Sequence, residues 1–242
     1  MDIYSIATVP ADAAASRAPA RAAGPDLEAL LRWLAPHLPA LRPPCTLERI
    51  DGGQSNPTWI LRGAGAGAWV LRAKPAPAAS LPASAHAIER EAHVLRALEQ
   101  TAVPVPRVRA LCEDESVIGV AFYVMDFVPG RVFRDATLPE IAMAERGAYH
   151  DQANRILAAL HSVDWRALGL TDFGRHTGFF TRQARRWSQQ YALAAAATAP
   201  IEAMEHLAEW LPAHIPAGAD GEATVRLTHG DYRLENLPFH PT

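Results

Sequence analysis

The sequence predicts an α+β fold with two lobes, in which strands come first and helices follow. Short apolar segments separated by glycine-containing turns occupy the first half of the chain, and segments with helical periodicity dominate beyond residue 137. Such segregation favours an α+β protein over a chain of alternating βαβ units. The length of 242 residues suffices for one large domain or for two small lobes around a cleft.

Few side chains near the N-terminus could pack into a core. Residues 1–24 are rich in alanine and proline, and we interpret them as a flexible leader. The next segment, 25–38, carries leucines at helical spacing, and Asp26 is suited to cap a helix at its start. The leucines on this face are Leu27, Leu30, Leu31, Leu34 and Leu38. We therefore expect the first helix there.

Three short strands are expected after this helix, joined by the turn sequences GGQSNP and AGAG. Their ranges are 45–51, 58–63 and 68–73. Because short strands joined by tight turns pair with each other, this pattern predicts an antiparallel meander. A helix is expected next at 84–100, then an extended linker over VPVPRV at 103–108, and one or two buried strands at 117–128.

Helices are expected to dominate the second half of the chain. The clearest helical patterns lie at 154–163, 182–196 and 201–211. A last strand is expected at 223–228, directly before the polar stretch HGDYRLEN. The expected organisation is a leader at 1–24, an N-terminal lobe at 25–128 and a partial helical C-terminal lobe at 129–242.

Composition argues against several classes of function. The net charge is −3, so there is no basic excess that would favour nucleic acid as a partner. Cys45 and Cys112 lack metal-type spacing, which argues against a disulfide framework and suits a reducing compartment. The sequence shows neither a membrane-spanning pattern nor a signal peptide. We expect a cytoplasmic protein that acts on a small molecule.

The stretch HGDYRLEN at 229–236 gathers the groups that phosphoryl transfer requires. A hydroxyl that attacks a phosphate needs a base to accept its proton and metal ions to offset the charge on the phosphoryl oxygens. Asp231 could supply the base, and Asn236 could supply an amide oxygen for Mg²⁺. Protein kinases place an Asp and an Asn at the same spacing, in a motif that begins with His. The alternative is a capped turn that follows a strand.

Two further features of the first half suit a nucleotide site. A glycine-rich turn lies between the first two strands, where a backbone loop could cover phosphates; an ordinary hairpin turn is the alternative. The residues of this turn are Gly52, Gly53, Gln54, Ser55 and Asn56. A strand cation held by a carboxylate of the next helix would grip the phosphates. Arg72 and Lys74 share one face of the strand, and Glu89 and Glu91 lie on the helix, so spacing does not select the pair.

These motifs resemble the aminoglycoside phosphotransferase and choline kinase family of the protein-kinase-like superfamily. Further segments that carry the resemblance are GGQSNPTWIL, WVLRAKP, LAALHSVDW and RQARRWSQQY. The similarity extends over about residues 45–242. Within the family, the sequence resembles the subgroup of kinase domains that are fused to acyl-CoA dehydrogenases in animals. The resemblance implies a two-lobe, protein-kinase-like fold and the use of ATP and Mg²⁺. It also implies transfer of a phosphoryl group to a substrate hydroxyl, with a hydroxyacyl-CoA as a candidate acceptor.

The resemblance assigns roles to single residues of the nucleotide and metal sites. Asp231 would be the general base and Asn236 a magnesium ligand. Arg72 would take the place of the cation on the third strand, with Glu91 as its helix partner. An arginine there can grip phosphate oxygens with two parallel hydrogen bonds.

The adenine and acceptor sites are expected in two other segments. Residues 125–128 resemble a hinge that meets adenine, with Met125 and Phe127 near the base; strand packing is the alternative for both side chains. The helical segment RQARRWSQQY could contact an anionic acceptor such as CoA, and a solvated basic face is the alternative. The residues expected to contact the acceptor are Arg182, Gln183, Trp187 and Tyr191.

The sequence departs from the family pattern at its end. Family members continue from the catalytic loop to a second Asp that binds the metal, whereas this sequence reads ENLPFHPT and ends. Pro238 stands where the family usually has an apolar strand residue, and proline lacks a backbone donor. We therefore expect a C-terminally truncated member that holds only the first part of the active site. The alternative function is a non-catalytic nucleotide-binding or interaction module.

Overall fold

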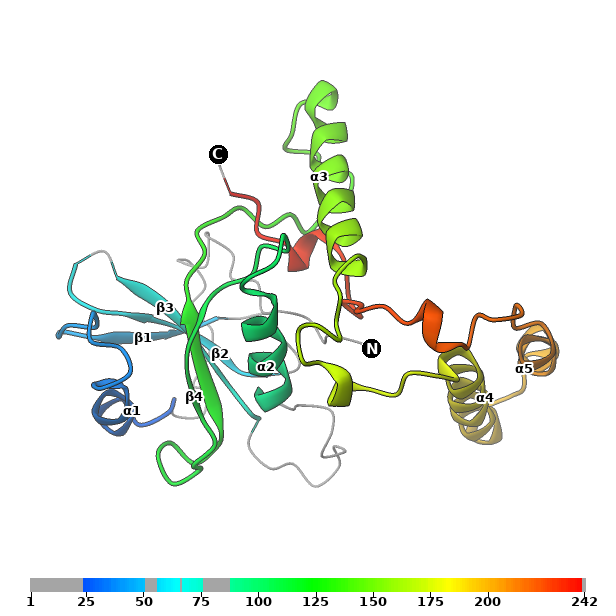
Figure 1. The fold of residues 1–242 in the computed structure, drawn as a ribbon, viewed down its shortest axis with the longest axis horizontal. Helices are drawn as coiled ribbons and strands as arrows, with labels where there is room; N and C mark the ends of the chain where they lie inside the picture. Colours follow the sequence, from blue (N-terminus) through cyan, green and yellow to red (C-terminus); the bar gives the residue numbers. More distant parts are fainter. Residues whose placement is uncertain (1–23, 51–55, 66, 76–87, 241–242) are drawn as a thin grey trace. The chain divides into compact units, whose positions relative to one another are not determined.

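The computed structural model describes residues 24–50, 56–65, 67–75 and 88–240, and it divides into two compact units (Figure 1). The smaller unit comprises Trp165–Leu227. The larger unit comprises the described residues up to Asp164 together with those from Thr228 onward. The stretch HGDYRLEN therefore belongs to the same unit as the strands of the first half of the chain.

A five-stranded antiparallel sheet forms the centre of the larger unit (Figure 1). Its strands are β1 (Thr46–Arg49), β2 (Thr58–Arg62), β3 (Ala68–Ala73), β4 (Val108–Cys112) and β5 (Phe122–Asp126). Their order in space is β1-β2-β3-β5-β4. The predicted meander of the first three strands is confirmed, as is the antiparallel pairing.

The last two strands in chain order, β4 and β5, differ from the prediction. β4 occupies residues 108–112, which begin at the end of the segment expected to be a linker. Val108, Ala110 and Cys112 are all buried. A register irregularity separates Val108 from Ala110, so Val108 packs in the core cluster under α2, while Ala110 and Cys112 pack in the cluster that also contains Leu61 and Leu71. β5 begins only at Phe122, because the chain before it turns: Gly119 has a φ of 89° and its N–H donates to the carbonyl of Glu115 at 2.8 Å.

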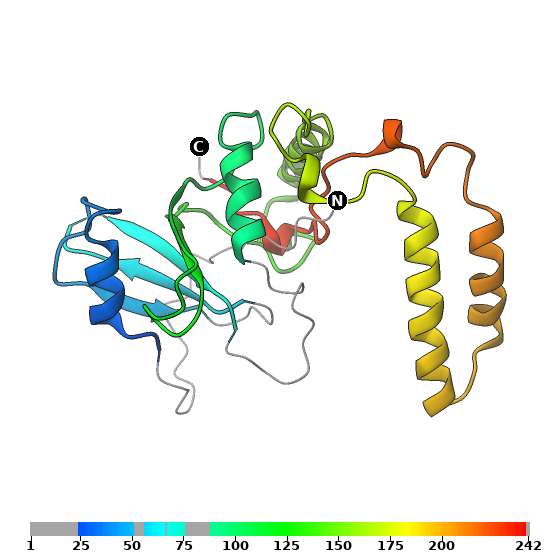
Figure 2. The same cartoon turned by 60° about the horizontal axis from the view of Figure 1, so that its bottom comes forward.

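Two helices cover opposite faces of this sheet (Figures 1 and 2). α1 (Leu27–Leu34) buries Leu30 and Leu34 in a core cluster that includes Leu61 and Leu71. α2 (Ile88–Leu98) buries Ile88, Ala92 and Leu95 against the other face, in a cluster that includes Ile60, Val70, Tyr123 and Met125. Because neighbouring residues of a strand point to opposite faces, Leu71 faces α1 while Val70 and Arg72 face α2.

The start of α1 follows from its cap. Asp26 accepts hydrogen bonds at one carboxylate oxygen from the N–H groups of Glu28, at 2.9 Å, and Ala29, at 3.1 Å. These bonds satisfy two of the amide groups that a helix leaves without intrahelical partners at its start. The capping role predicted for Asp26 is confirmed, although the helix ends at Leu34 rather than at residue 38.

A third core cluster joins α3 (Met143–His161) to the end of the chain. Phe133, Leu138, Ile141 and Leu234 are buried in it, and Phe239 packs against them. The backbone of Arg131 pairs with that of Phe239 through two hydrogen bonds of 2.8 Å, so the chain pairs directly after Pro238 despite the missing donor. α3 is longer than the helix expected at 154–163.

The smaller unit consists mainly of a pair of helices, α4 (Phe179–Ala197) and α5 (Glu202–Ala213), which lie side by side (Figure 2). The hydroxyl of Tyr191 closes the turn between them, because it accepts from the N–H of Ile201 at 2.7 Å and donates to its carbonyl at 3.1 Å. Neither helix contains a buried residue. Among the described residues, no helix is both long and apolar enough to cross a membrane.

The strand expected at 223–228 is wrong. Residues Glu222–Thr224 form a short 3₁₀ helix, η2, and residues 225–227 belong to no strand. The side chain of Thr224 donates to the carbonyls of Ala219 and Gly221, both at 2.7 Å, and so stabilises a turn instead. The apolar residues of this segment were therefore a weak signal, because a strand also requires a neighbour with which to pair.

Candidate active site

Arg72 of β3 and Glu91 of α2 form a buried ion pair. Nε of Arg72 donates to Oε2 of Glu91 at 2.6 Å, and Nη2 donates to Oε1 at 3.3 Å. Their side chains are only 7% and 11% exposed. Burial disfavours the charged guanidinium, but the adjacent carboxylate of Glu91 outweighs this effect, and the pKa of Arg72 is raised. Arg72 therefore stays charged inside the protein.

The second pair that the sequence spacing allowed also forms. Nζ of Lys74 contacts Oε1 of Glu89, and the two side chains are 30% and 31% exposed. The position of α2 thus assigns one carboxylate to Arg72 of β3 and another to Lys74, which directly follows β3. Burial distinguishes the pairs, because the side chains of Arg72 and Glu91 are nearly enclosed, whereas those of Lys74 and Glu89 are about a third exposed. The pairing of Arg72 with Glu91 is confirmed, and its contact with phosphates stays a prediction.

Asn56 joins the ion pair from the end of the predicted phosphate loop. Its side-chain nitrogen donates to Oε1 of Glu91 at 2.8 Å, and the residue is only 3% exposed. Asn56 therefore acts on the carboxylate that orients Arg72. The other residues of the predicted loop, Gly52, Gly53, Gln54 and Ser55, lie outside the described residues.

The loop at 229–236, the predicted catalytic loop, brings Asp231 and Asn236 into direct contact. Nδ2 of Asn236 donates to the backbone carbonyl of Asp231 at 2.9 Å and to its Oδ2 at 2.8 Å. A short 3₁₀ helix, η3 (Leu234–Asn236), turns the chain back, and the buried side chain of Leu234 anchors it. Both hydrogen bonds use the amide nitrogen of Asn236, so they leave its amide oxygen for the role of a magnesium ligand. The local geometry fits the predicted metal contact.

Arg233 is a charged neighbour of the predicted base that the sequence analysis did not single out. Its Nε lies 3.3 Å from Oδ1 of Asp231 and 2.6 Å from Oε1 of Glu235. The guanidinium therefore offsets the negative charge of two carboxylates that lie close together on the loop. A positive residue two positions after the Asp was the sequence signal for this contact.

His229, the first residue of the loop, is only 5% exposed. The N–H of Asp231 donates to Nδ1 of His229 at 3.3 Å. Nδ1 is therefore an acceptor, and a neutral His229 carries its proton on Nε2. Burial lowers the pKa of His229, and the nearby charge of Asp231 opposes this shift without cancelling it.

Acidification is expected to destabilise the fold through His229. Below the ordinary pKa of 6.5, the unfolded chain takes up a proton at His229 that the folded chain does not bind. The free energy of unfolding should therefore be unaffected by this group above that pH and should fall as the pH drops below it. Urea unfolding from about pH 7.5 to about pH 5.5 measures the slope. His229→Gln should flatten the slope, whereas the exposed-site control His206→Gln should not; equal slopes in all three proteins would contradict the prediction.

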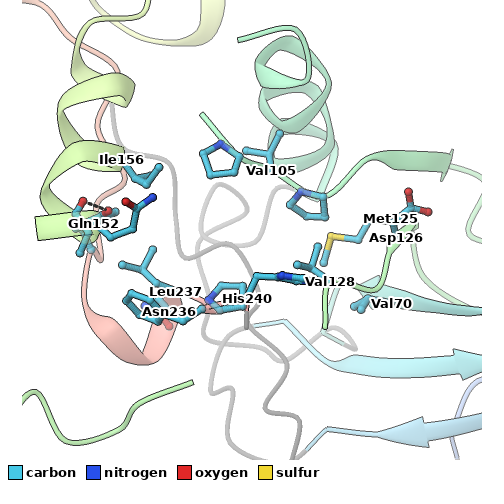
Figure 3. Close-up of a pocket in the computed structure, with 16 residues that line it drawn as sticks. Val70, Val105, Met125, Asp126, Val128, Gln152, Ile156, Asn236, Leu237 and His240 are labelled. Atoms are coloured by element: carbon cyan, nitrogen blue, oxygen red, sulfur yellow. Dashed lines mark hydrogen bonds between the residues drawn. The ribbon is translucent and has the colours of Figure 1, made fainter. Parts of the chain in front are cut away.

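A pocket of about 700 Å³ opens between β3, the hinge, α3 and the end of the chain (Figure 3). Its walls are mainly apolar, and Asn236 of the catalytic loop is part of them. The lining residues from the sheet and hinge are Val70, Met125, Asp126 and Val128. Those from α3 and the chain end include Gln152, Ile156, Leu237 and His240. An apolar pocket that reaches polar catalytic groups suits a flat aromatic base attached to a charged group.

The hinge at 125–128 contributes to the pocket unevenly. Met125 is a lining residue, as predicted for a side chain near the base, whereas Phe127 is not among the lining residues and packs beside the core cluster under α2. Asp126 is held by Arg109, whose Nε and Nη2 donate to its carboxylate oxygens at 2.6 and 2.8 Å. This bidentate pair fixes Asp126, the second residue of the predicted hinge, at the pocket's edge.

The residues predicted to contact the acceptor all lie on α4, in the smaller unit. Trp187 is 60% exposed, and the guanidinium of Arg186 lies 5.6 Å from the centre of its ring. Arg182 and Gln183 are partly exposed. Tyr191 uses its hydroxyl to close the turn into α5. Their contact with an acceptor stays a prediction.

Comparison with known proteins agrees with this geometry. Residues 46–242 match the model of the phosphotransferase enzyme family. The chain is 44% identical to acyl-CoA dehydrogenase family member 10 of Mus musculus, over 82% of this chain and 18% of the relative. It is 47% identical to acyl-CoA dehydrogenase family member 11 of Gallus gallus, over 81% of this chain and 24% of the relative. The chain thus spans a quarter or less of these curated relatives.

Solved structures show the same fold. A crystal structure described as an aminoglycoside phosphotransferase from Ralstonia eutropha superposes with a TM-score of 0.78 at 47% identity, covering 90% of this chain and 62% of that one. A macrolide 2'-phosphotransferase from Brachybacterium faecium has a TM-score of 0.50 at 23% identity, covering 81% of this chain and 62% of that one. The protein-kinase-like α+β fold is confirmed, and the chain belongs to the phosphotransferase enzyme family.

Proposed function

We propose that this chain is an ATP-dependent phosphotransferase that acts on the hydroxyl of a small molecule. The observation that carries the proposal is the pocket in which the hinge residue Met125 and the catalytic-loop residue Asn236 line the same cavity. A nucleotide base bound at the hinge would thereby have its phosphates directed toward the loop that carries Asp231. Membership of the phosphotransferase family supports this assignment.

The nucleotide would be held by groups from two sides of the larger unit. The apolar walls around Val70 and Met125 suit the adenine ring. Arg72 stays charged and is oriented by Glu91, so it is suited to bind phosphate oxygens. The predicted loop at 52–56 would cover these phosphates, and Asn56 at its end already contacts Glu91.

In the reaction, Asp231 would accept the proton of the attacking hydroxyl. Asn236 orients Asp231 through its amide nitrogen and would bind magnesium through its amide oxygen. Magnesium supplies positive charge that offsets the charge of the transferred phosphoryl group. The remaining contribution of the protein is positioning, because phosphoryl transfer requires the attacking and leaving oxygens to lie in line.

A hydroxyacyl-CoA is the acceptor that we propose. Two of the most similar relatives are named as acyl-CoA dehydrogenases, which supports an acyl-CoA substrate for the region that this chain matches. The exposed arginines and Trp187 of α4 would suit the phosphates and the adenine of CoA. A cytoplasmic location is consistent with ATP as the phosphoryl donor.

A non-catalytic nucleotide-binding module is the second candidate. Within the part of the chain that the structure describes, no group of three or more His, Cys, Asp or Glu side chains is arranged to hold a metal ion. Magnesium bound through ATP phosphates needs only one or two protein carboxylates, so Asp231 beside Asn236 could suffice for this chain to hold ATP without transferring its phosphoryl group.

Two measurements on the purified chain distinguish the two candidate functions. Calorimetry with ATP and Mg²⁺ tests binding, and release of ADP in the presence of a 4-hydroxyacyl-CoA tests transfer. The matched control acceptor is the acyl-CoA of the same length without the hydroxyl. ADP release that requires the hydroxyl supports the phosphotransferase, binding without ADP release supports the module, and failure to bind ATP overturns both.

A further inference from the structure

Arg72 lies in the middle of a row of polar side chains that crosses three strands. In the register of the sheet, Thr58 of β2 and Tyr123 of β5 are its direct partners on either side. All three side chains point to the face covered by α2, because directly opposed residues of paired strands share a face. Tyr123 is fully buried, and Thr58 is 8% exposed. Hydroxyl groups therefore flank the buried guanidinium within an otherwise apolar layer.

Each hydroxyl binds one member of the ion pair. The hydroxyl of Tyr123 donates to Oε2 of Glu91 at 3.2 Å. On the other side, Nη1 of Arg72 donates to the hydroxyl oxygen of Thr58 at 3.3 Å, and that hydroxyl donates to the carbonyl of Asn56 at 3.0 Å. Oε2 of Glu91 thus accepts from both Arg72 and Tyr123, while Oε1 accepts from Arg72 and Asn56.

The phenol of Tyr123 is suited to remain a donor. Burial raises its pKa well above the ordinary value, and the negative charge of Glu91 raises it further. Inside a protein, an ion pair is held in one geometry only when additional hydrogen bonds satisfy its remaining donors and acceptors. Tyr123 supplies such a bond to the carboxylate, and Thr58 supplies one to the guanidinium.

We propose that Tyr123 and Thr58 are positioning residues that hold the Arg72–Glu91 pair in the geometry that binds nucleotide phosphates. This inference rests on the proposed function, because it assumes that Arg72 contacts those phosphates. Neither hydroxyl needs to touch the nucleotide. Without the Tyr123 hydroxyl, Oε2 of Glu91 loses one of its two donors, and the carboxylate can rotate and draw Arg72 with it. Loss of the Tyr123 hydroxyl is therefore expected to weaken the binding of the nucleotide phosphates and to leave the binding of the base unchanged.

The test compares the affinities of ATP and adenosine, because adenosine contains the base and lacks phosphates. Calorimetry gives both dissociation constants for the wild-type chain, Tyr123→Phe and Thr58→Val. Tyr123→Phe is expected to weaken ATP binding by roughly threefold to tenfold and to leave adenosine binding within about a factor of two. Thr58→Val is expected to change the ratio in the same direction. Adenosine binding also reports that the pocket of each variant is folded.

Tyr149→Phe is the matched control, because it removes a tyrosine hydroxyl from the cluster around Phe133, away from the ion pair. Its ratio of ATP to adenosine affinity should equal that of the wild type. Equal weakening of ATP and adenosine in Tyr123→Phe would overturn the inference, as would an unchanged ratio. If Tyr123→Phe does not fold, Thr58→Val decides by the same criterion. If the wild-type chain binds ATP more tightly than adenosine, the proposed phosphate contact is supported. Equal affinities of the wild-type chain for ATP and adenosine would overturn both the phosphate contact and this inference.

Discussion

Changing Asp231 to Asn is expected to lower ATP-dependent phosphotransfer by roughly 10²- to 10⁴-fold, the usual effect of losing a general base. Asparagine has nearly the same shape, and its side-chain oxygen can still accept the hydrogen bond from Nδ2 of Asn236. It carries no negative charge and does not accept the proton of the attacking hydroxyl. The loop should therefore keep its fold, and the loss should appear in kcat.

The measurement is the rate of hydroxyl-dependent ADP release, together with the affinity for ATP. Glu235→Gln is the matched control, since Glu235 is also a carboxylate of the loop and also lies beside Arg233, at 2.6 Å. Its turnover should fall far less than that of Asp231→Asn. Turnover near the wild-type value in Asp231→Asn would remove Asp231 from the mechanism.

Changing Glu91 to Ala is expected to lower the free energy of unfolding of the sheet-containing unit by about 3–5 kcal/mol. The substitution leaves the charge of Arg72 in the interior, where its side chain is 7% exposed, without its carboxylate partner. It also removes the acceptor of the Tyr123 hydroxyl and of the Asn56 amide. Buried donors that lose their acceptor keep their desolvation penalty, and no hydrogen bond then offsets it.

Hydrogen exchange of the β3 and β5 amides measures this effect within the unit concerned, independently of the smaller unit. Glu89→Ala provides the control, because it breaks the neighbouring ion pair with Lys74. The side chains of both Lys74 and Glu89 are about a third exposed. An ion pair that is partly open to water contributes only about 0–1 kcal/mol. Similar losses in the two variants would show that burial does not distinguish these pairs.

Patterns within short segments predicted much of the fold. The strands at 58–63 and 68–73 agree with β2 and β3 to within one residue, because their apolar residues and the turn between them are local features. β4 and the failed strand at 223–228 show the opposite case. VRALC pairs with β5, with one irregularity between Val108 and Ala110, whereas residues 223–227 belong to no strand. The presence of a partner, which lies elsewhere in the chain, decided both outcomes.

The sequence by itself placed Asp231 and Asn236 in one short motif, and the five-residue spacing suffices to bring the two side chains together in a loop. Residue spacing left open which of Arg72 and Lys74 meets which carboxylate of α2, and the family resemblance selected Arg72 and Glu91. Both possible pairs form in the structure, and the position of α2 over the sheet decided that Arg72 and Glu91 are the buried one. The same packing placed Tyr123 and Thr58 beside that pair. Burial depends on every element that covers a residue, and the neighbours in sequence specify only a part of that cover.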